Sequence, residues 1–159
     1  MIELRVSFVD VYVLRLSHPG LEALVLRRAP GGRCPGSWEV VHGRIEQGED
    51  PTEAGLRELR EETGLEPVRF YNLSRAELFY RHRTREVAVI PAFAAFAAPE
   101  SEVRLSPEHD GYEWLSLDAA RNRVSWPRER RALYDVALLL SDGTAGALED
   151  VLRIEGLGE

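Results

Sequence analysis

Cysteine is nearly absent from this chain, since Cys34 is the only one among 159 residues. A single thiol excludes an intramolecular disulfide and a cysteine-rich zinc site. Cys34 lies among glycines and prolines without an obvious activating base, so we expect no catalytic role for it. The chain also lacks an apolar run of the roughly 20 residues that a membrane helix needs. The segment 1–16 has charged residues within its apolar pattern and no signal-peptide core. We therefore expect a cytoplasmic protein with no membrane partner.

Lysine is absent as well, so all 20 basic residues, histidine aside, are arginines. The 27 acidic residues outnumber them, which gives a net charge of −7. Proteins grip duplex nucleic acid through a basic surface, so this balance argues against a nucleic-acid duplex as partner. It does not argue against small phosphorylated substrates, because a bound divalent metal ion can reverse the local charge.

The chain does contain many strand-like and helix-like segments, with no internal repeat and no linker. Alternating apolar and polar residues, bounded by turn residues, predict strands at 5–16, 22–28, 38–41, 68–73, 76–81, 87–98 and 112–115. Helices are predicted at 52–63, 117–121 and 127–140. These elements indicate an α+β fold in one domain over residues 1–159, a length that can bury its own core.

The helix predicted at 52–63 has recognisable signals at both ends. Asp50 is a candidate cap, and Pro51 follows at the first helical position. Gly64 can adopt the left-handed conformation that ends a helix. Gly55, inside the helix, costs roughly 1 kcal/mol relative to alanine, and the sequence gives no reason for it.

Three carboxylates share one face of this helix. At 100° per residue, Glu61 and Glu62 fall within about 60° of Glu58 on either side. Like charges at this spacing repel one another, so a cation would stabilise them. Clustered oxygen ligands suit Mg²⁺ or Mn²⁺ better than zinc. On the helix alone, a solvated acidic face is as good an interpretation as a metal site.

The residues around the helix complete a longer pattern. Gly43 precedes Glu49 by six residues, and Arg57-Glu58-Leu59-Arg60-Glu61-Glu62-Thr63-Gly64-Leu65 follows. Residues 43–65 thus read G-x5-E-x7-R-E-U-x-E-E-x-G-U, where U is aliphatic, with every specified position matched. This is the Nudix box, so the chain resembles the Nudix (MutT-like) hydrolase family. The resemblance implies an α/β/α sandwich with a mixed central sheet.

The resemblance also implies roles for the residues of the box. Members of the family hold Mg²⁺, with Mn²⁺ as a substitute, through box glutamates and the carbonyl of the first glycine. In this chain those ligands would be Glu58, Glu61, Glu62 and Gly43. The box arginine, Arg57, is implied to bind Glu49 and brace the loop. Members of the family differ in which glutamate is the general base, so the resemblance does not assign it. Many of them also form homodimers, so a homodimer is consistent with the resemblance.

A second informative segment lies outside the box, at Ser106-Pro107-Glu108-His109-Asp110-Gly111-Tyr112-Glu113-Trp114-Leu115. It resembles a segment found in dATP and dihydroneopterin triphosphate pyrophosphohydrolases and in diadenosine polyphosphate hydrolases. In the former branch the glutamate reaches the metal site, so Glu108 is a candidate metal ligand and base. We interpret the adjacent His109 as structural.

The sequence before the box favours the first of these branches. Diadenosine polyphosphate hydrolases typically have a lysine in W-x-x-P-K-G, whereas residues 38–43 here read Trp-Glu-Val-Val-His-Gly. The expected function is therefore Mg²⁺-dependent cleavage of a nucleoside triphosphate, resembling dATP, or of a related nucleoside diphosphate-linked compound. Diadenosine polyphosphate hydrolysis is the alternative. Tyr80 supports that alternative weakly, and Arg28 and Trp38 are further candidates for substrate contacts.

Three other activities found on this fold fit less well. An ADP-ribose pyrophosphatase typically has a proline near position 80, which this chain lacks. An isopentenyl diphosphate isomerase needs a catalytic cysteine, and Cys34 fits that role poorly. A non-catalytic nucleotide-binding module commonly lacks box glutamates, whereas this box is intact.

Overall fold

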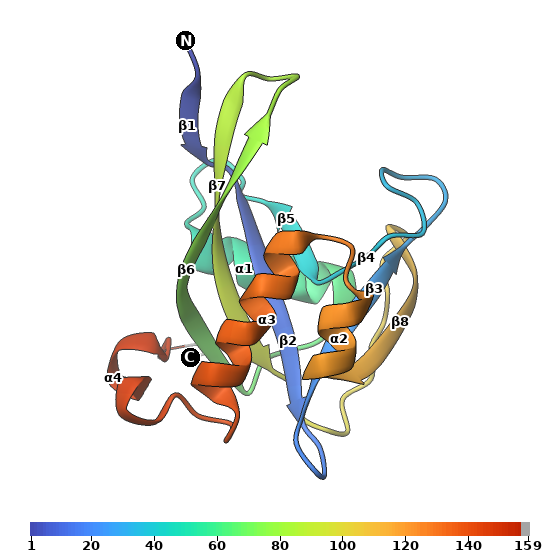
Figure 1. The fold of residues 1–159 in the computed structure, drawn as a ribbon, viewed down its shortest axis with the longest axis vertical. Helices are drawn as coiled ribbons and strands as arrows, with labels where there is room; N and C mark the ends of the chain where they lie inside the picture. Colours follow the sequence, from blue (N-terminus) through green and yellow to red (C-terminus); the bar gives the residue numbers. More distant parts are fainter. Residues whose placement is uncertain (157–159) are drawn as a thin grey trace.

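The computed structural model describes residues 1–156 as helices packed on both faces of one twisted sheet (Figure 1). Its strands are β1 (Glu3–Val6), β2 (Phe8–Leu16), β3 (Leu21–Arg28), β4 (Trp38–Glu39), β5 (Val41–Arg44), β6 (Arg69–Arg81), β7 (Glu86–Phe96) and β8 (His109–Ser116). Strand β7 pairs in parallel with β1 and β2, and every other pairing is antiparallel. The mixed sheet and the α+β class are confirmed.

The helices divide the core into two parts. Helix α1 (Pro51–Thr63) covers one face and packs on a cluster that includes Val11, Phe70 and Phe93. Helices α2 (Leu117–Arg123) and α3 (Pro127–Leu140) cover the other face, around Tyr12 and Phe96. A short 3₁₀ turn, η1 (Gly146–Leu148), and α4 (Glu149–Leu152) follow. No helix among residues 1–156 is both long and apolar enough to span a membrane.

Helix α1 is built as its sequence predicts. The Asp50 side chain accepts a hydrogen bond from Glu53 N–H at 3.0 Å, and the Glu53 side chain accepts one from Asp50 N–H at 3.0 Å. This reciprocal pair satisfies two backbone donors at the helix start. Gly64 ends the helix in the left-handed conformation, with φ of 69°. Residues at the two ends of the helix therefore set where it begins and ends.

Gly55 has a packing reason that the sequence did not reveal. A Cβ atom there would lie 3.3 Å from Phe70 Cζ and 3.4 Å from side-chain atoms of Phe93 and Val11. Glycine therefore lets α1 lie close against the sheet, which compensates for its poor helix propensity.

The structure divides some predicted strands and joins others. The strands predicted at 68–73 and 76–81 are joined in the single strand β6, Arg69–Arg81, with a register shift between Asn72 and Ala76. The strand predicted at 38–41 becomes two, because β4 pairs with β3 whereas β5 pairs with β2. Strands β2 and β3 pair with each other only at Leu14–Leu16 and Leu21–Ala23. Beyond these residues the two strands separate, and the β4–β5 segment fills the opening between them, with β4 paired to β3 and β5 paired to β2. That opening positions the candidate site.

Candidate active site

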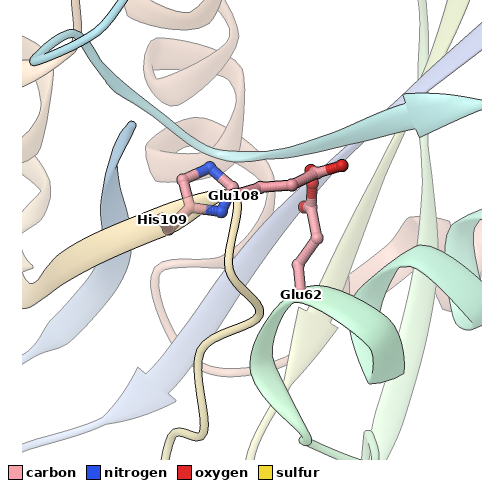
Figure 2. A group of neighbouring side chains, drawn as sticks. All are labelled: Glu62, Glu108 and His109. Atoms are coloured by element: carbon pink, nitrogen blue, oxygen red, sulfur yellow. The ribbon is translucent and has the colours of Figure 1, made fainter. Parts of the chain in front are cut away.

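The candidate site lies between α1, β5 and the segment that enters β8. Helix α1 contributes Glu58 and Glu62, β5 contributes Gly43, and the third segment contributes Glu108. In Figure 2, Glu62 extends from α1 toward Glu108 and His109, and the three side chains converge. Glu62 and Glu108, 46 positions apart in sequence, therefore lie in one cluster.

Gly43 leaves the space that the Glu58 carboxyl group fills. A Cβ atom on Gly43 would lie 1.9 Å from Glu58 Cδ and 2.2 Å from Glu58 Oε1. No side chain can occupy that volume while the carboxylate stays in place. The glycine therefore allows the Glu58 carboxylate and the backbone of β5 to face the same small space.

Glu62 is a buried carboxylate that lacks sufficient partners. Its side chain is 2% exposed, and Oε2 accepts a hydrogen bond from His42 N–H at 3.2 Å. Its Oε1 has no hydrogen-bond partner among the described residues. Burial raises the pKa of Glu62 well above the ordinary value, and the negative charge of Glu58 raises it further. The metal-free protein thus resists ionising this group.

Glu58 shares that environment but has one cationic neighbour. Burial raises the pKa of Glu58, and Arg57 partly offsets this through a hydrogen bond of 2.8 Å from Nη1 to Glu58 Oε1. Within residues 1–156 Arg57 forms an ion pair with Glu58, whereas neither the buried Glu62 nor the exposed Glu108 forms one with an arginine, although their charges raise the pKa of the nearby Arg28. An uncompensated buried charge is costly, so this group favours an added cation.

Arg57 also fixes the loop before the helix. Its Nε and Nη2 donate to Glu49 Oε1 and Oε2 at 2.8 and 2.9 Å, and Nη2 donates to the Arg44 carbonyl at 2.7 Å. These hydrogen bonds lower the pKa of Glu49. The ion pair implied by the resemblance is present. Glu61 lies on the exposed side of the helix, 3.2 Å from Arg57 Nη1, so it sits at the rim of the site.

His109 joins the site to a buried ion pair. Its side chain is fully buried, and Nε2 lies 2.9 Å from Glu39 Oε1. Arg28 Nη1 donates to the same Glu39 oxygen at 2.9 Å. Burial would raise the pKa of Glu39, but the hydrogen bonds from His109 and Arg28 lower it overall. A ligand atom of His109 lies within 4.8 Å of carboxylate oxygens of Glu62 and Glu108.

These residues fit a divalent metal ion. Glu62 offers a buried oxygen without a partner, and Gly43 leaves a cradle beside Glu58 that a Cβ would fill. Carboxylate and carbonyl oxygens are the donors that Mg²⁺ and Mn²⁺ prefer. The donors come from a capped helix and a paired strand, so their positions are largely set before an ion binds.

The three candidates for substrate contacts lie in different places. Arg28 is engaged with Glu39 and with the Arg33 carbonyl at 2.6 Å. Trp38 packs against the core under α2 and α3, on the face of β4 opposite Glu39, with the Arg123 guanidinium 4.8 Å from its ring centroid. Tyr80 is 54% exposed near the end of the β6–β7 hairpin. Arg28 is therefore linked through Glu39 and His109 to the cluster of Glu62 and Glu108. Trp38 faces the other side of the sheet and is not part of this cluster.

Sequence reasoning missed a second buried charge network, on the opposite face of β5. Arg128 donates to both carboxylate oxygens of Asp10 at 2.9 and 3.1 Å, and His42 Nδ1 lies 2.7 Å from Asp10 Oδ1. Glu129 accepts a hydrogen bond from Val40 N–H at 3.2 Å, and burial raises its pKa well above the ordinary value. Asp10 gave the one available signal, because it is a lone charge within the apolar run 8–14.

Curated proteins with similar sequences belong to several enzyme classes. The chain is 35% identical over 123 residues to the octanoyltransferase of Myxococcus xanthus, covering 73% of this chain but only 32% of that protein. The chain therefore spans about a third of that relative. It is also 35% identical over 108 residues to the asymmetrical bis(5'-nucleosyl)-tetraphosphatase of Rattus norvegicus, covering 67% of this chain and 71% of that enzyme.

Solved structures show the same fold. A Caenorhabditis elegans Ap4A hydrolase in a binary complex superposes with a TM-score of 0.71 at 20% identity, covering 84% of this chain and 96% of that one. The Escherichia coli dihydroneopterin triphosphate pyrophosphohydrolase gives 0.65 at 22% identity, covering 87% and 99%. The family model of the NUDIX domain matches residues 6–136. The box, the sheet and this match agree, and the chain therefore belongs to the NUDIX family of hydrolases, which act on phosphorus-containing acid anhydrides.

Proposed function

We propose that this chain is an Mg²⁺-dependent pyrophosphohydrolase, with Mn²⁺ as a substitute, that cleaves a nucleoside triphosphate to the monophosphate and pyrophosphate. The observation that supports it best is the pair of buried carboxylates, Glu58 and Glu62, whose pKa values are raised and of which, within residues 1–156, only Glu58 forms an ion pair with an arginine. A diphosphate linkage is itself anionic and is repelled by nearby carboxylates. A cation between them would offset this repulsion. Gly43, Glu58, Glu61, Glu62 and Glu108 are the proposed ligands.

Each residue has a definite task in this proposal. When bound, a divalent ion neutralises charge on the phosphate oxygens and lowers the pKa of an attacking water. Glu58 and Glu62 place negative charge opposite it from a rigid helix, and Gly43 keeps the strand backbone close enough to add its carbonyl. Arg57, held by Glu49, keeps Glu58 oriented and the loop closed.

Glu108 is the proposed general base. It is exposed on the open side of the site, so substrate and water can reach it, unlike the buried Glu58 and Glu62. Its backbone carbonyl accepts a hydrogen bond from Ala29 N–H at 2.9 Å, which ties its segment to the end of β3. A base must lie near the water that it deprotonates, and the proximity of Glu108 to Glu62 fits this requirement.

Diadenosine polyphosphate hydrolysis is the second candidate. The relative from Rattus norvegicus and the structure from Caenorhabditis elegans are both named as enzymes of that class. A nucleoside triphosphate remains the first choice because the chain has no lysine before the box and because Glu108 lies beside Glu62. The dihydroneopterin triphosphate enzyme of Escherichia coli, with the same fold, acts on a triphosphate by its name.

The test is product analysis on a substrate panel, with Mg²⁺ and with EDTA. The panel contains dATP and the other nucleoside triphosphates, diadenosine tetraphosphate and ADP-ribose. We expect EDTA-sensitive release of pyrophosphate and a monophosphate from one triphosphate. Glu62→Gln should abolish this release, whereas Glu100→Gln, the same change at an exposed position remote from the box in sequence, should not alter it.

Two other outcomes would revise the proposal in different ways. Faster cleavage of diadenosine tetraphosphate than of any triphosphate would replace the first candidate with the second, and Tyr80→Ala would then be the variant to assay for a raised KM. Turnover that persists in EDTA, or in Glu62→Gln, would contradict a metal site on α1.

A homodimer and a cytoplasmic location remain predictions. Size-exclusion chromatography with light scattering would measure the first, and cell fractionation the second.

A further inference from the structure

The geometry points to His109 as a nitrogen ligand: its Nδ1, with carboxylate oxygens of Glu62 and Glu108, forms a position for a divalent transition-metal ion. This inference rests on the metal site proposed above and adds a residue that the box does not contain. It replaces our structural interpretation of His109. A site made only of oxygen ligands would favour Mg²⁺, whereas one imidazole ligand raises the affinity for borderline ions such as Co²⁺, Ni²⁺ or Zn²⁺.

The proton on the His109 ring is fixed by Glu39. Nε2 lies 2.9 Å from Glu39 Oε1, and an ionised carboxylate can only accept hydrogen bonds. Arg28 Nη1 donates to the same oxygen at 2.9 Å, so a guanidinium compensates the charge of the Glu39 carboxylate. Nε2 therefore carries the proton, and in the neutral ring Nδ1 has a free lone pair.

That lone pair is buried and has no hydrogen-bond partner among the described residues. The His109 side chain is fully buried, and within residues 1–156 no group hydrogen-bonds to Nδ1. Leaving a buried acceptor unmatched costs free energy, so such atoms usually have a function or a missing partner. Glu62 Oε1, a second buried atom without a partner, lies on the same cluster.

The spacing of the three side chains suits one ion. Their ligand atoms lie within 4.8 Å of one another. Donors on opposite sides of a metal ion are separated by about 4.2 Å when each bond is about 2.1 Å, so small side-chain movements would close the site. A histidine whose other nitrogen is bound by a carboxylate is the usual way in which proteins orient an imidazole toward a metal.

The inference also explains the arrangement of Arg28 and Glu39. Glu39 comes from β4 and Arg28 from the end of β3, and Arg28 and His109 both bind the same carboxylate oxygen of Glu39, Oε1. Arg28 would thus act by positioning Glu39 and, through it, the His109 ring. Its effect on a metal should be smaller than that of His109 itself.

The test measures Co²⁺ and Mg²⁺ binding to the full chain by calorimetry, without substrate. We expect His109→Gln to weaken Co²⁺ binding by about 100-fold and Glu39→Gln by about 10-fold, with less than a threefold change for Mg²⁺. His82→Gln, the same substitution at an exposed histidine in the β6–β7 turn, is the matched control and should change neither.

A measurement on the unmodified protein covers the case in which His109→Gln does not fold. In the proton NMR spectrum of the Co²⁺-loaded wild type, we expect a hyperfine-shifted signal that disappears in D2O, from the Nε2–H of a metal-bound imidazole. Absence of this signal from a protein that binds Co²⁺ would overturn the inference.

Failure of the inference is distinguishable from failure of the proposed function. If Glu62→Gln abolishes Co²⁺ binding but His109→Gln leaves it unchanged, the metal site stands and the nitrogen ligand is wrong. If neither substitution affects binding of either ion, both the inference and the proposed metal site are wrong.

Discussion

Asp10 and Glu62 are buried carboxylates on opposite faces of the β4–β5 segment, and their pKa values are shifted in opposite directions. Burial alone would raise the pKa of Asp10, but hydrogen bonds and charge from His42 and Arg128 lower it overall. Burial raises the pKa of Glu62, and the charges of Glu58, Glu39 and Glu108 raise it further, against a backbone hydrogen bond from His42 that lowers it. Both side chains are at most 2% exposed, so burial does not explain the difference. The cationic partners do.

The comparison separates a structural network from a site. Asp10 and Arg128 compensate each other's charge, and Arg128 also lies 3.5 Å from a carboxylate oxygen of Glu129, whose pKa burial raises. On the other face, Glu62 lacks a cationic side-chain partner within the described part of the chain. His42 connects the two, since its ring binds Asp10 and its backbone N–H binds Glu62. The paired network around Asp10 rigidifies the strand. The acidic group around Glu62, whose charge is not compensated, would be stabilised by a bound cation.

The largest expected effect is on activity. Glu58→Gln and Glu62→Gln should each lower kcat by about 10³-fold or more, because each removes a charged donor at the reacting centre. Steady-state release of pyrophosphate measures this loss, and circular dichroism checks that the fold is kept. Near-normal rates in both variants would contradict a metal site at Glu58 and Glu62. They would also contradict the functional difference that we infer between the two faces.

The next effect is on stability, at the opposite face. Asp10→Asn should lower the free energy of unfolding by about 3–5 kcal/mol, because it leaves the buried Arg128 guanidinium without its counter-charge. Urea denaturation with EDTA present measures the change. Glu62→Gln should not lower stability in the same experiment. If Glu62→Gln is as damaging as Asp10→Asn, the contrast between a paired and an unpaired acid is wrong.

Two glycines of the box give a matched pair of alanine substitutions. Gly43→Ala should lower kcat by about 100-fold, because the new Cβ displaces the Glu58 carboxyl group. Gly55→Ala meets only contacts of 3.3–3.4 Å, and its gain in helix propensity of about 1 kcal/mol opposes the crowding. We expect Gly55→Ala to keep its activity within about threefold of the wild type and its stability within about 1 kcal/mol. Equal losses of activity in the two variants would contradict the role given to the Gly43 cradle.

The smallest effect is on the pH dependence of stability, and its sign differs between the faces. A raised folded pKa means that ionisation of Glu62 destabilises the metal-free protein as pH rises above its ordinary value of 4.5. A lowered folded pKa means that Asp10 contributes stability above its ordinary value of 3.8, which is lost as pH falls through the folded pKa. In EDTA, the gain in stability from Glu62→Gln should therefore grow between pH 5 and pH 8.

The matching measurement is a series of denaturation curves over that pH range. The loss in stability from Asp10→Asn should shrink in acid, as pH falls through the folded pKa of Asp10. A gain from Glu62→Gln that does not vary with pH would show that Glu62 does not titrate differently in the folded protein.

The local parts of the site could be predicted because their signals lie close together in sequence. The cap at Asp50, the stop at Gly64 and the carboxylate face of α1 each depend on residues within one or two helical turns. The resemblance to the box added Gly43 and the Arg57–Glu49 pair, and a second resemblance added Glu108. In the structure Gly43 lies against Glu58, Arg57 binds Glu49, and Glu108 lies near Glu62, whereas their roles in binding and catalysis stay predictions.

The long-range parts could not be predicted. Periodicity reported a strand at 38–41 but not that β4 pairs with β3 and β5 with β2. Periodicity also did not show that β6 is one strand, because a register shift between Asn72 and Ala76 interrupts the alternation of its side chains. Asp10 could be noticed as an isolated charge, but its partner Arg128 lies 118 residues away.

The sequence by itself determined that one helix presents clustered carboxylates and that a glycine and an arginine accompany them at fixed spacing. Helix geometry is local, so residue spacing alone decides which side chains share a face. Only the tertiary structure decided which acids are compensated. Strand β3 pairs with β4 on one side and β8 on the other, which brings Glu39 to His109, and α3 packs so that Arg128 reaches Asp10. Charge compensation depends on distances across the fold, and these are set by strand register and helix packing.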